Sequence, residues 1–87
     1  NSMKVDLHGL PLSEAKLKSQ IAVAKAWSDS QSKLELVHGH NLGTVIKDYI
    51  QTPEGLRKDV SQIYPEVSDL VLKDKGLGST IVKFKRH

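Results

Sequence analysis

The chain has 87 residues, of which 38% are hydrophobic and 26% charged, and its formal net charge at pH 7 is +3. This composition predicts one small globular domain rather than a disordered chain, and it excludes a membrane span because no apolar run approaches the ~20 residues that a bilayer requires. The absence of cysteine excludes a disulfide framework and fits a reducing, cytoplasmic location, while the modest positive charge is compatible with a polyanionic partner.

The first strand is expected over residues 4–7. Asn1 and Ser2 stand ahead of Met3 and look like a cloning remnant, so the domain is assigned to residues 4–87. Val5 and Leu7 alternate with polar side chains, a pattern that places these two residues on one face of a strand.

The first helix is expected from Ser13, a suitable N-cap residue, to about Ser28. Its apolar residues recur at close to helical spacing, which predicts a buried stripe along one side. That stripe consists of Leu17, Ile21, Ala24 and Trp27.

Residues 34–37 form a nearly continuous apolar run, which predicts a strand buried on both faces. A second helix is expected to begin at Thr44. Thr52 followed by Pro53 and Glu54 is a helix restart signal, so two helical segments are favoured over one kinked helix before Pro65 ends them. The expected buried positions of both segments are Val45, Ile46, Tyr49, Ile50, Leu56, Val60 and Ile63.

Residues 68–74 and 79–85 resemble strands, and the glycine-containing connection 75–78 predicts an antiparallel hairpin between them. The element order is therefore β-α-β-α-(α)-β-β. This order predicts an α/β fold, a two-layer sandwich with a mixed four-stranded sheet.

A His-Gly pair ends each of the first two strands, His8-Gly9 and His38-Gly39. If these strands are parallel neighbours, both imidazoles lie at one edge of the sheet, beside helix N-termini that attract anions. Gly9, Gly39 and Gly43 would let the backbone approach a ligand closely. The repetition therefore predicts a phosphate site.

The side chains at this edge also suit phosphodiester cleavage. Asp6 can orient the imidazole of His8 and stabilise its charged form. With His38 as the second imidazole, one ring would take the proton of an RNA 2′-hydroxyl while the other protonates the leaving oxygen. On DNA water must attack, usually with the help of a metal ion. Asp6, His8 and His38 are thus the candidate catalytic residues, no cofactor is required, Mg²⁺ dependence stays open, and no metal site is assigned.

Other residues are candidates for holding nucleic acid. His40 and Asn41 lie in the glycine-containing loop, and Lys47 lies in the first turn of the second helix. Basic side chains gather on the terminal hairpin, where they form either a solvated strand face or a surface that follows a phosphate backbone. These are Lys73, Lys75, Lys83, Lys85 and Arg86. A purely structural alternative also exists for His8, which can cap the sheet edge by bonding a loop carbonyl.

Three ordered segments resemble the small MutS-related (Smr) domain. Residues 5–9 (Val-Asp-Leu-His-Gly) resemble the family's Leu-Asp-Leu-His-Gly signature, with Val in place of the first Leu. Residues 37–39 (Val-His-Gly), with Gly43 beyond, resemble its second signature, although the glycines are spaced more widely here. Residues 78–84 resemble its last strand. The resemblance covers residues 4–85.

The resemblance implies a fold like the C-terminal domain of bacterial translation initiation factor three. It also implies a nucleic-acid-binding domain, because several Smr domains nick DNA or cut RNA. The cleavage role would fall on Asp6 and His8, and substrate binding on His38, Gly39 and Gly43. The expected function is therefore a nucleic-acid-binding domain, expected to be monomeric, with endonuclease activity on DNA or RNA. The alternatives are a non-catalytic binding module and a ribosome-associated adaptor.

Overall fold

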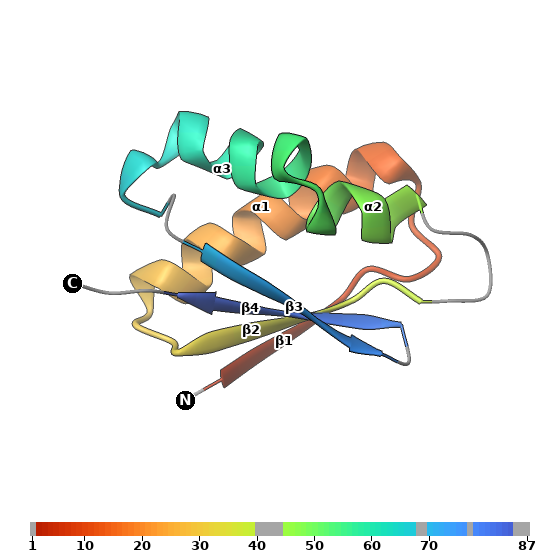
Figure 1. Ribbon diagram of the computed structural model, residues 1–87, viewed down its shortest axis with the longest axis horizontal. Helices are drawn as coiled ribbons and strands as arrows, with labels where there is room; N and C mark the ends of the chain where they lie inside the picture. The colour runs from red at the N-terminus through yellow and green to blue at the C-terminus, as the bar shows by residue number, and fades with distance from the viewer. Residues whose placement is uncertain (1, 40–44, 68–69, 77, 85–87) are drawn as a thin grey trace.

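The computed structural model describes residues 2–39, 45–67, 70–76 and 78–84. Helices cover one face of a four-stranded sheet and leave the other face open, so the domain has two layers (Figure 1). The elements in chain order are β1 (Ser2–Asp6), α1 (Leu12–Ser28), β2 (Lys33–Val37), α2 (Val45–Gln51), η1 (Pro53–Arg57), α3 (Lys58–Ile63), η2 (Pro65–Val67), β3 (Leu70–Gly76) and β4 (Ser79–Phe84). This is the predicted α/β architecture, although β1 begins at Ser2 and so includes two residues ahead of the expected strand.

The sheet is mixed, with the strand order β1-β2-β4-β3. β1 and β2 pair in parallel, and Asp6 is the register partner of Val37. β4 runs antiparallel to both β2 and β3, and its pairing with β3 confirms the predicted hairpin. The C-terminal ends of β1 and β2 therefore lie side by side, which brings the two His-Gly pairs to one edge.

β2 is buried on one face only, which corrects the expectation of burial on both. Leu34 and Leu36 are fully buried, whereas Glu35 and Val37 keep part of their surface exposed. The physical reason is that helices pack on one side of the sheet alone. No helix in the described part of the chain is long and apolar enough to cross a membrane.

The buried side of α1 also differs from the prediction. Leu17 and Ile21 are 61% and 58% exposed. Small residues occupy the packed side because α1 lies against β1 and β2 as well as α2 and α3, and short side chains allow that close approach. The helix is preceded by Pro11 at its N-cap and has no side-chain cap, so Ser13 does not serve as one. The buried residues of α1 are Ala15, Ser19, Ala22, Val23 and Ala26.

The helical stretch 45–63 is interrupted, with α2 ending at Gln51 and η1 and α3 following from Pro53, as predicted from the restart signal at Thr52. The break is centred on Gly55, whose backbone angles (φ −95°, ψ −118°) are not helical. A side chain there would overlap the carbonyl oxygen of Tyr49, so the kink packs backbone directly against α2. Val45 and Ile63 are both more than half exposed, which corrects their expected burial.

Candidate functional site

Asp6 and His8 form a bonded pair where β1 ends. The backbone N–H of Leu7 donates to the carbonyl of Val37 and holds this segment against β2. One carboxylate oxygen of Asp6, Oδ1, then accepts the backbone N–H of His8 at 3.0 Å and lies 2.5 Å from its ring Nδ1. A single oxygen thus fixes both the turn and the imidazole, the orienting role predicted for Asp6.

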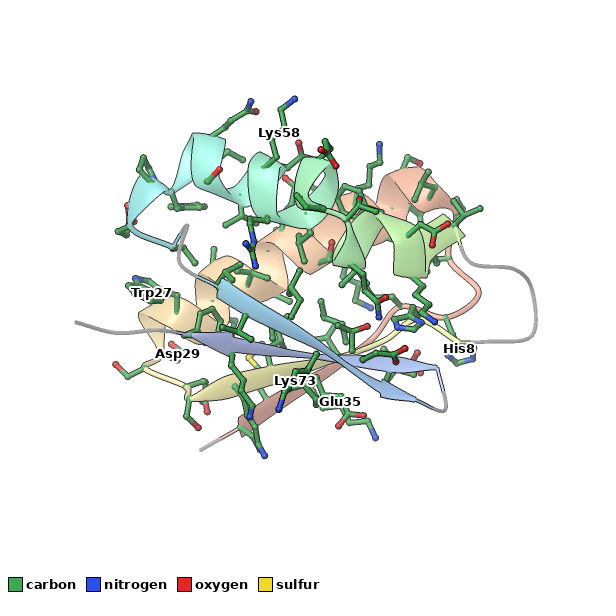
Figure 2. All side chains as sticks on the ribbon, viewed as in Figure 1. His8, Trp27, Asp29, Glu35, Lys58 and Lys73 are labelled. Carbon is green, nitrogen blue, oxygen red and sulfur yellow. The ribbon has the colours of Figure 1, made fainter. Side chains whose placement is uncertain are left out.

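The bond determines how the imidazole is presented. Because a carboxylate only accepts hydrogen bonds, Nδ1 of His8 carries the proton, and Nε2 is the unprotonated nitrogen when the ring is neutral. The side chains of His8 and Asp6 are 65% and 56% exposed. His8 lies at the end of the sheet opposite Trp27 and Asp29 (Figure 2). Nε2 is therefore positioned to exchange a proton with a bound molecule.

Asp6 is electrostatically matched to this role. The hydrogen bonds from the His8 ring and backbone N–H are the main causes that hold the pKa of Asp6 below its ordinary value of 3.8, and Lys18 adds a smaller effect. Asp6 is therefore ionised at neutral pH and accepts both hydrogen bonds from His8 as a carboxylate.

Gly39 brings the second motif into contact with the first. Its φ is +80°, a left-handed conformation, and a Cβ added there would lie 3.2 Å from the Cβ of His8. The absence of a side chain at Gly39 therefore lets the end of β2 pass directly beside His8. The predicted convergence of the two His-Gly pairs is confirmed.

His38 faces inward. It is 7% exposed, and both of its ring nitrogens have partners. Nδ1 lies 3.0 Å from the carbonyl oxygen of Gly39 and so carries the proton, while Nε2 accepts from the hydroxyl of Thr80 at 2.8 Å. Gln51 in turn donates to that hydroxyl oxygen at 2.8 Å. His38 therefore ties β2 to β4 and α2 and presents no ring nitrogen to solvent.

The backbone beside His38 is also occupied. The N–H groups of His38 and Gly39 both donate to the carbonyl of Gly78, at 2.8 and 3.0 Å. Gly39 is a predicted phosphate-binding residue, yet its N–H and that of His38 hold the terminal hairpin in place. Gly9 is the more open glycine, since it is exposed and nothing lies within 4 Å of where its Cβ would be.

Lys47 is joined to the hairpin rather than projecting alone. Its Nζ lies 3.4 Å from Oδ2 of Asp74, and Oδ1 of Asp74 accepts the backbone N–H of Gly76. This N–H first, and Lys47 second, lower the pKa of Asp74 from its ordinary value. The positive charge of Lys47 is therefore partly offset by the carboxylate of Asp74.

The structure gathers Asp6, His8, Gly9 and Gly39 at one edge. Sequence reasoning did not anticipate the supporting roles of Thr80, Gln51 and Gly78, although a threonine on the buried face of the last strand is a signal that could have been used. The remaining predicted site residues, His40, Asn41 and Gly43, lie outside the described residues, as do Lys85 and Arg86. Among the residues described, no three His, Asp or Glu side chains gather to hold a metal ion.

The chain is similar to proteins of a known family. The family model of the Smr domain matches residues 5–85. The crystal structure of the Smr domain of Thermus thermophilus MutS2 is similar to this chain, with a TM-score of 0.61 and 26% sequence identity over 97% of this chain and 99% of that one. No curated protein matches the chain significantly.

Proposed function

The chain belongs to the Smr domain family, and from this premise we propose that it binds nucleic acid and cleaves phosphodiester bonds at the Asp6–His8 pair. The observation that carries the proposal is the bond between Asp6 Oδ1 and His8 Nδ1, which leaves Nε2 as the unprotonated nitrogen of a mostly exposed side chain. A carboxylate that orients an imidazole in this way favours proton transfer at the opposite ring nitrogen.

RNA is the substrate that this pair suits best. Nε2 of His8 takes the proton of the 2′-hydroxyl, and the 2′-oxygen forms a bond to phosphorus as the bond from phosphorus to the 5′-oxygen breaks. The leaving 5′-oxygen takes a proton from solvent, and the products are a 2′,3′-cyclic phosphate and a 5′-hydroxyl. The imidazolium then releases its proton, and the Asp6 carboxylate stabilises this charged form throughout.

His38 acts in this proposal as a positioning residue, which departs from the second catalytic imidazole expected from the sequence. Its ring nitrogens bond to Thr80 and to the carbonyl of Gly39. The same ring thereby holds Gly39 in place beside His8. Loss of the His38 ring would therefore slow cleavage indirectly, because His8 would no longer be held in position.

A second candidate function is a non-catalytic nucleic-acid-binding module. The observation that favours it is the inward position of His38, because the described part of the site then presents the imidazole of His8 without a second exposed ring. The two functions share one binding surface and differ in whether His8 transfers a proton.

The deciding experiment compares the wild-type protein with a His8→Ala variant and with the double variant Asp6→Ala/His8→Ala. Each is incubated with labelled RNA and with supercoiled plasmid, with EDTA or with Mg²⁺. We expect wild type to cut RNA in EDTA and both variants to lose about 10²–10⁴-fold in rate, the usual contribution of a positioned acid–base group. Circular dichroism checks that all proteins are folded.

Glu66→Ala on η2, an exposed acidic residue away from the Asp6–His8 pair, is the matched control and should cut like wild type. Equal cleavage by wild type and a folded double variant would refute the catalytic role. Binding without cleavage of either substrate would instead establish the binding module.

A further inference from the structure

Four lysines lie on the open face of the sheet: Lys4, Lys33, Lys73 and Lys83, hereafter the lysine face. All four are exposed. Together with Glu35, Ile81 and a few neighbours they line a shallow groove of about 460 Å³. Lys73 and Glu35 project from the side of the sheet away from the helices (Figure 2).

Two of these lysines lie where the need to prevent pairing of an exposed edge strand does not explain them. Exposed lysines are common on edge strands, where they prevent pairing with other chains. That explanation suits Lys4 and Lys73, which lie on the edge strands β1 and β3. Lys33 and Lys83, however, lie on the central strands β2 and β4.

Lys33 and Lys83 are also direct partners in the antiparallel register. Like charges opposite each other on one face of a sheet destabilise the fold. Two carboxylates, those of Glu35 and Asp74, line the same groove, so the four lysines exceed the acidic side chains there by two. The face therefore carries a net positive charge, which a bound polyanion would offset.

The lysine face leads to the Asp6–His8 pair. Asp6 follows Lys4 by two residues on β1, so it projects from the same face of the strand about 7 Å further along. The register partners of Lys4 and Lys73 on the central strands are Glu35 and Ile81. No aromatic side chain is among the described residues that line the groove, so this surface suits phosphate contacts rather than base stacking.

We propose that the lysine face binds the sugar-phosphate backbone of a nucleic acid and directs it toward Asp6 and His8. This inference rests on the proposed function and names the surface that holds the substrate. Phosphate contacts of this kind are independent of sequence and weaken as salt concentration rises. Glu35 lies within the face and opposes binding through its negative charge.

The test measures binding of a fluorescein-labelled 20-nucleotide RNA by anisotropy between 50 and 200 mM salt. The variant is Lys33→Gln/Lys83→Gln. Loss of two phosphate contacts should reduce the slope of log K against log salt by about 1.4, which corresponds to roughly 25-fold weaker binding at 0.1 M salt. A 20-base-pair DNA duplex is measured in parallel, where the slope should change by about 1.8.

The matched control is Lys25→Gln/Lys58→Gln, which removes the same net charge from α1 and α3, with Lys58 visible on the helix layer (Figure 2). We expect this control to keep most of the affinity and the wild-type slope. A third variant, Glu35→Gln, should bind more tightly than wild type. Because the Lys33/Lys83 variant removes a repulsion, urea denaturation should find it at least as stable as wild type.

The outcomes separate the two proposals. If wild type binds and the Lys33/Lys83 variant loses no more affinity than its control, the lysine face is not the docking surface while the proposed function stands. If wild type binds neither RNA nor DNA, both proposals fail. A selective loss in the Lys33/Lys83 variant, with cleavage by His8 still detectable at high protein concentration, supports both.

Discussion

Replacement of Gly39 by alanine tests whether the contact between the two His-Gly pairs holds His8 in position. The cost has two parts. The left-handed backbone (φ +80°) costs an alanine about 1–2 kcal/mol, which for a domain of this size lowers Tm by about 4–16 °C. The new methyl group would also lie 3.2 Å from Cβ of His8, so the neighbour must shift by a few tenths of an ångström.

Gly9→Ala is the matched control. Its φ is +79°, so the backbone cost is the same, but nothing lies within 4 Å of the added methyl group. Because His8 is 65% exposed, its ring can move away at little cost in stability. We therefore expect similar losses of unfolding free energy in both variants, measured by urea denaturation, and a displaced His8 in Gly39→Ala alone.

The displacement is read from the carboxyl carbon of Asp6 by NMR titration. Hydrogen bonds from His8 hold the pKa of Asp6 below its ordinary value, so a displaced ring should raise that pKa toward 3.8 in Gly39→Ala and leave it at the wild-type position in Gly9→Ala. RNA cleavage, where present, should fall by up to about tenfold in Gly39→Ala. An unchanged Asp6 pKa in Gly39→Ala would show that this contact does not position His8.

Three further predictions concern acid stability, the buried network and the helix faces. Asp6 has a lowered folded-state pKa, so its contribution to stability should be complete above pH 4 and be lost as pH falls through the folded pKa. The difference in unfolding free energy between wild type and Asp6→Asn, measured in urea, should therefore be present at pH 7 and shrink below pH 4. A difference that does not change with pH would contradict this reasoning. Thr80→Val leaves Nε2 of buried His38 without its donor and should cost about 1–3 kcal/mol in urea, whereas Thr52→Val at an exposed site should change stability by less than about 0.5 kcal/mol. Ile21→Gln on the exposed side of α1 should change the free energy of unfolding by less than about 0.5 kcal/mol, whereas Leu36→Ala in the core should lower it by about 2–5 kcal/mol. Equal losses would mean that the exposed side of α1 is assigned wrongly.

The Asp6–His8 pair is the part of the candidate site that sequence alone located best. Asp6 and His8 are two residues apart, so their contact depends on the local backbone at the end of one strand, which the residue pattern already indicates. His38 is different, because its environment comes from Thr80 on β4 and Gln51 on α2, far away along the chain. Its burial could not be read from the residues around it.

The helix faces show the same division between local and distant information. Periodicity identified α1 as a helix, but the predicted stripe with Leu17 and Ile21 lies on its exposed side. Larger apolar residues usually mark the buried face, and here the close approach of α1 to both the sheet and the other helices reverses this rule in favour of alanine. Which face is buried is therefore a property of what packs against the helix.

Sequence by itself determined the order and type of the elements, the break after α2, the terminal hairpin and the Asp6–His8 pair, because each depends on residues within a few positions of one another. Tertiary structure alone decided that β2 is buried on one face and that His38 turns inward. It also decided that Lys33 and Lys83 face each other across two central strands. These features depend on contacts between segments distant in the chain, whose free energies are set by how the layers pack and not by any local pattern.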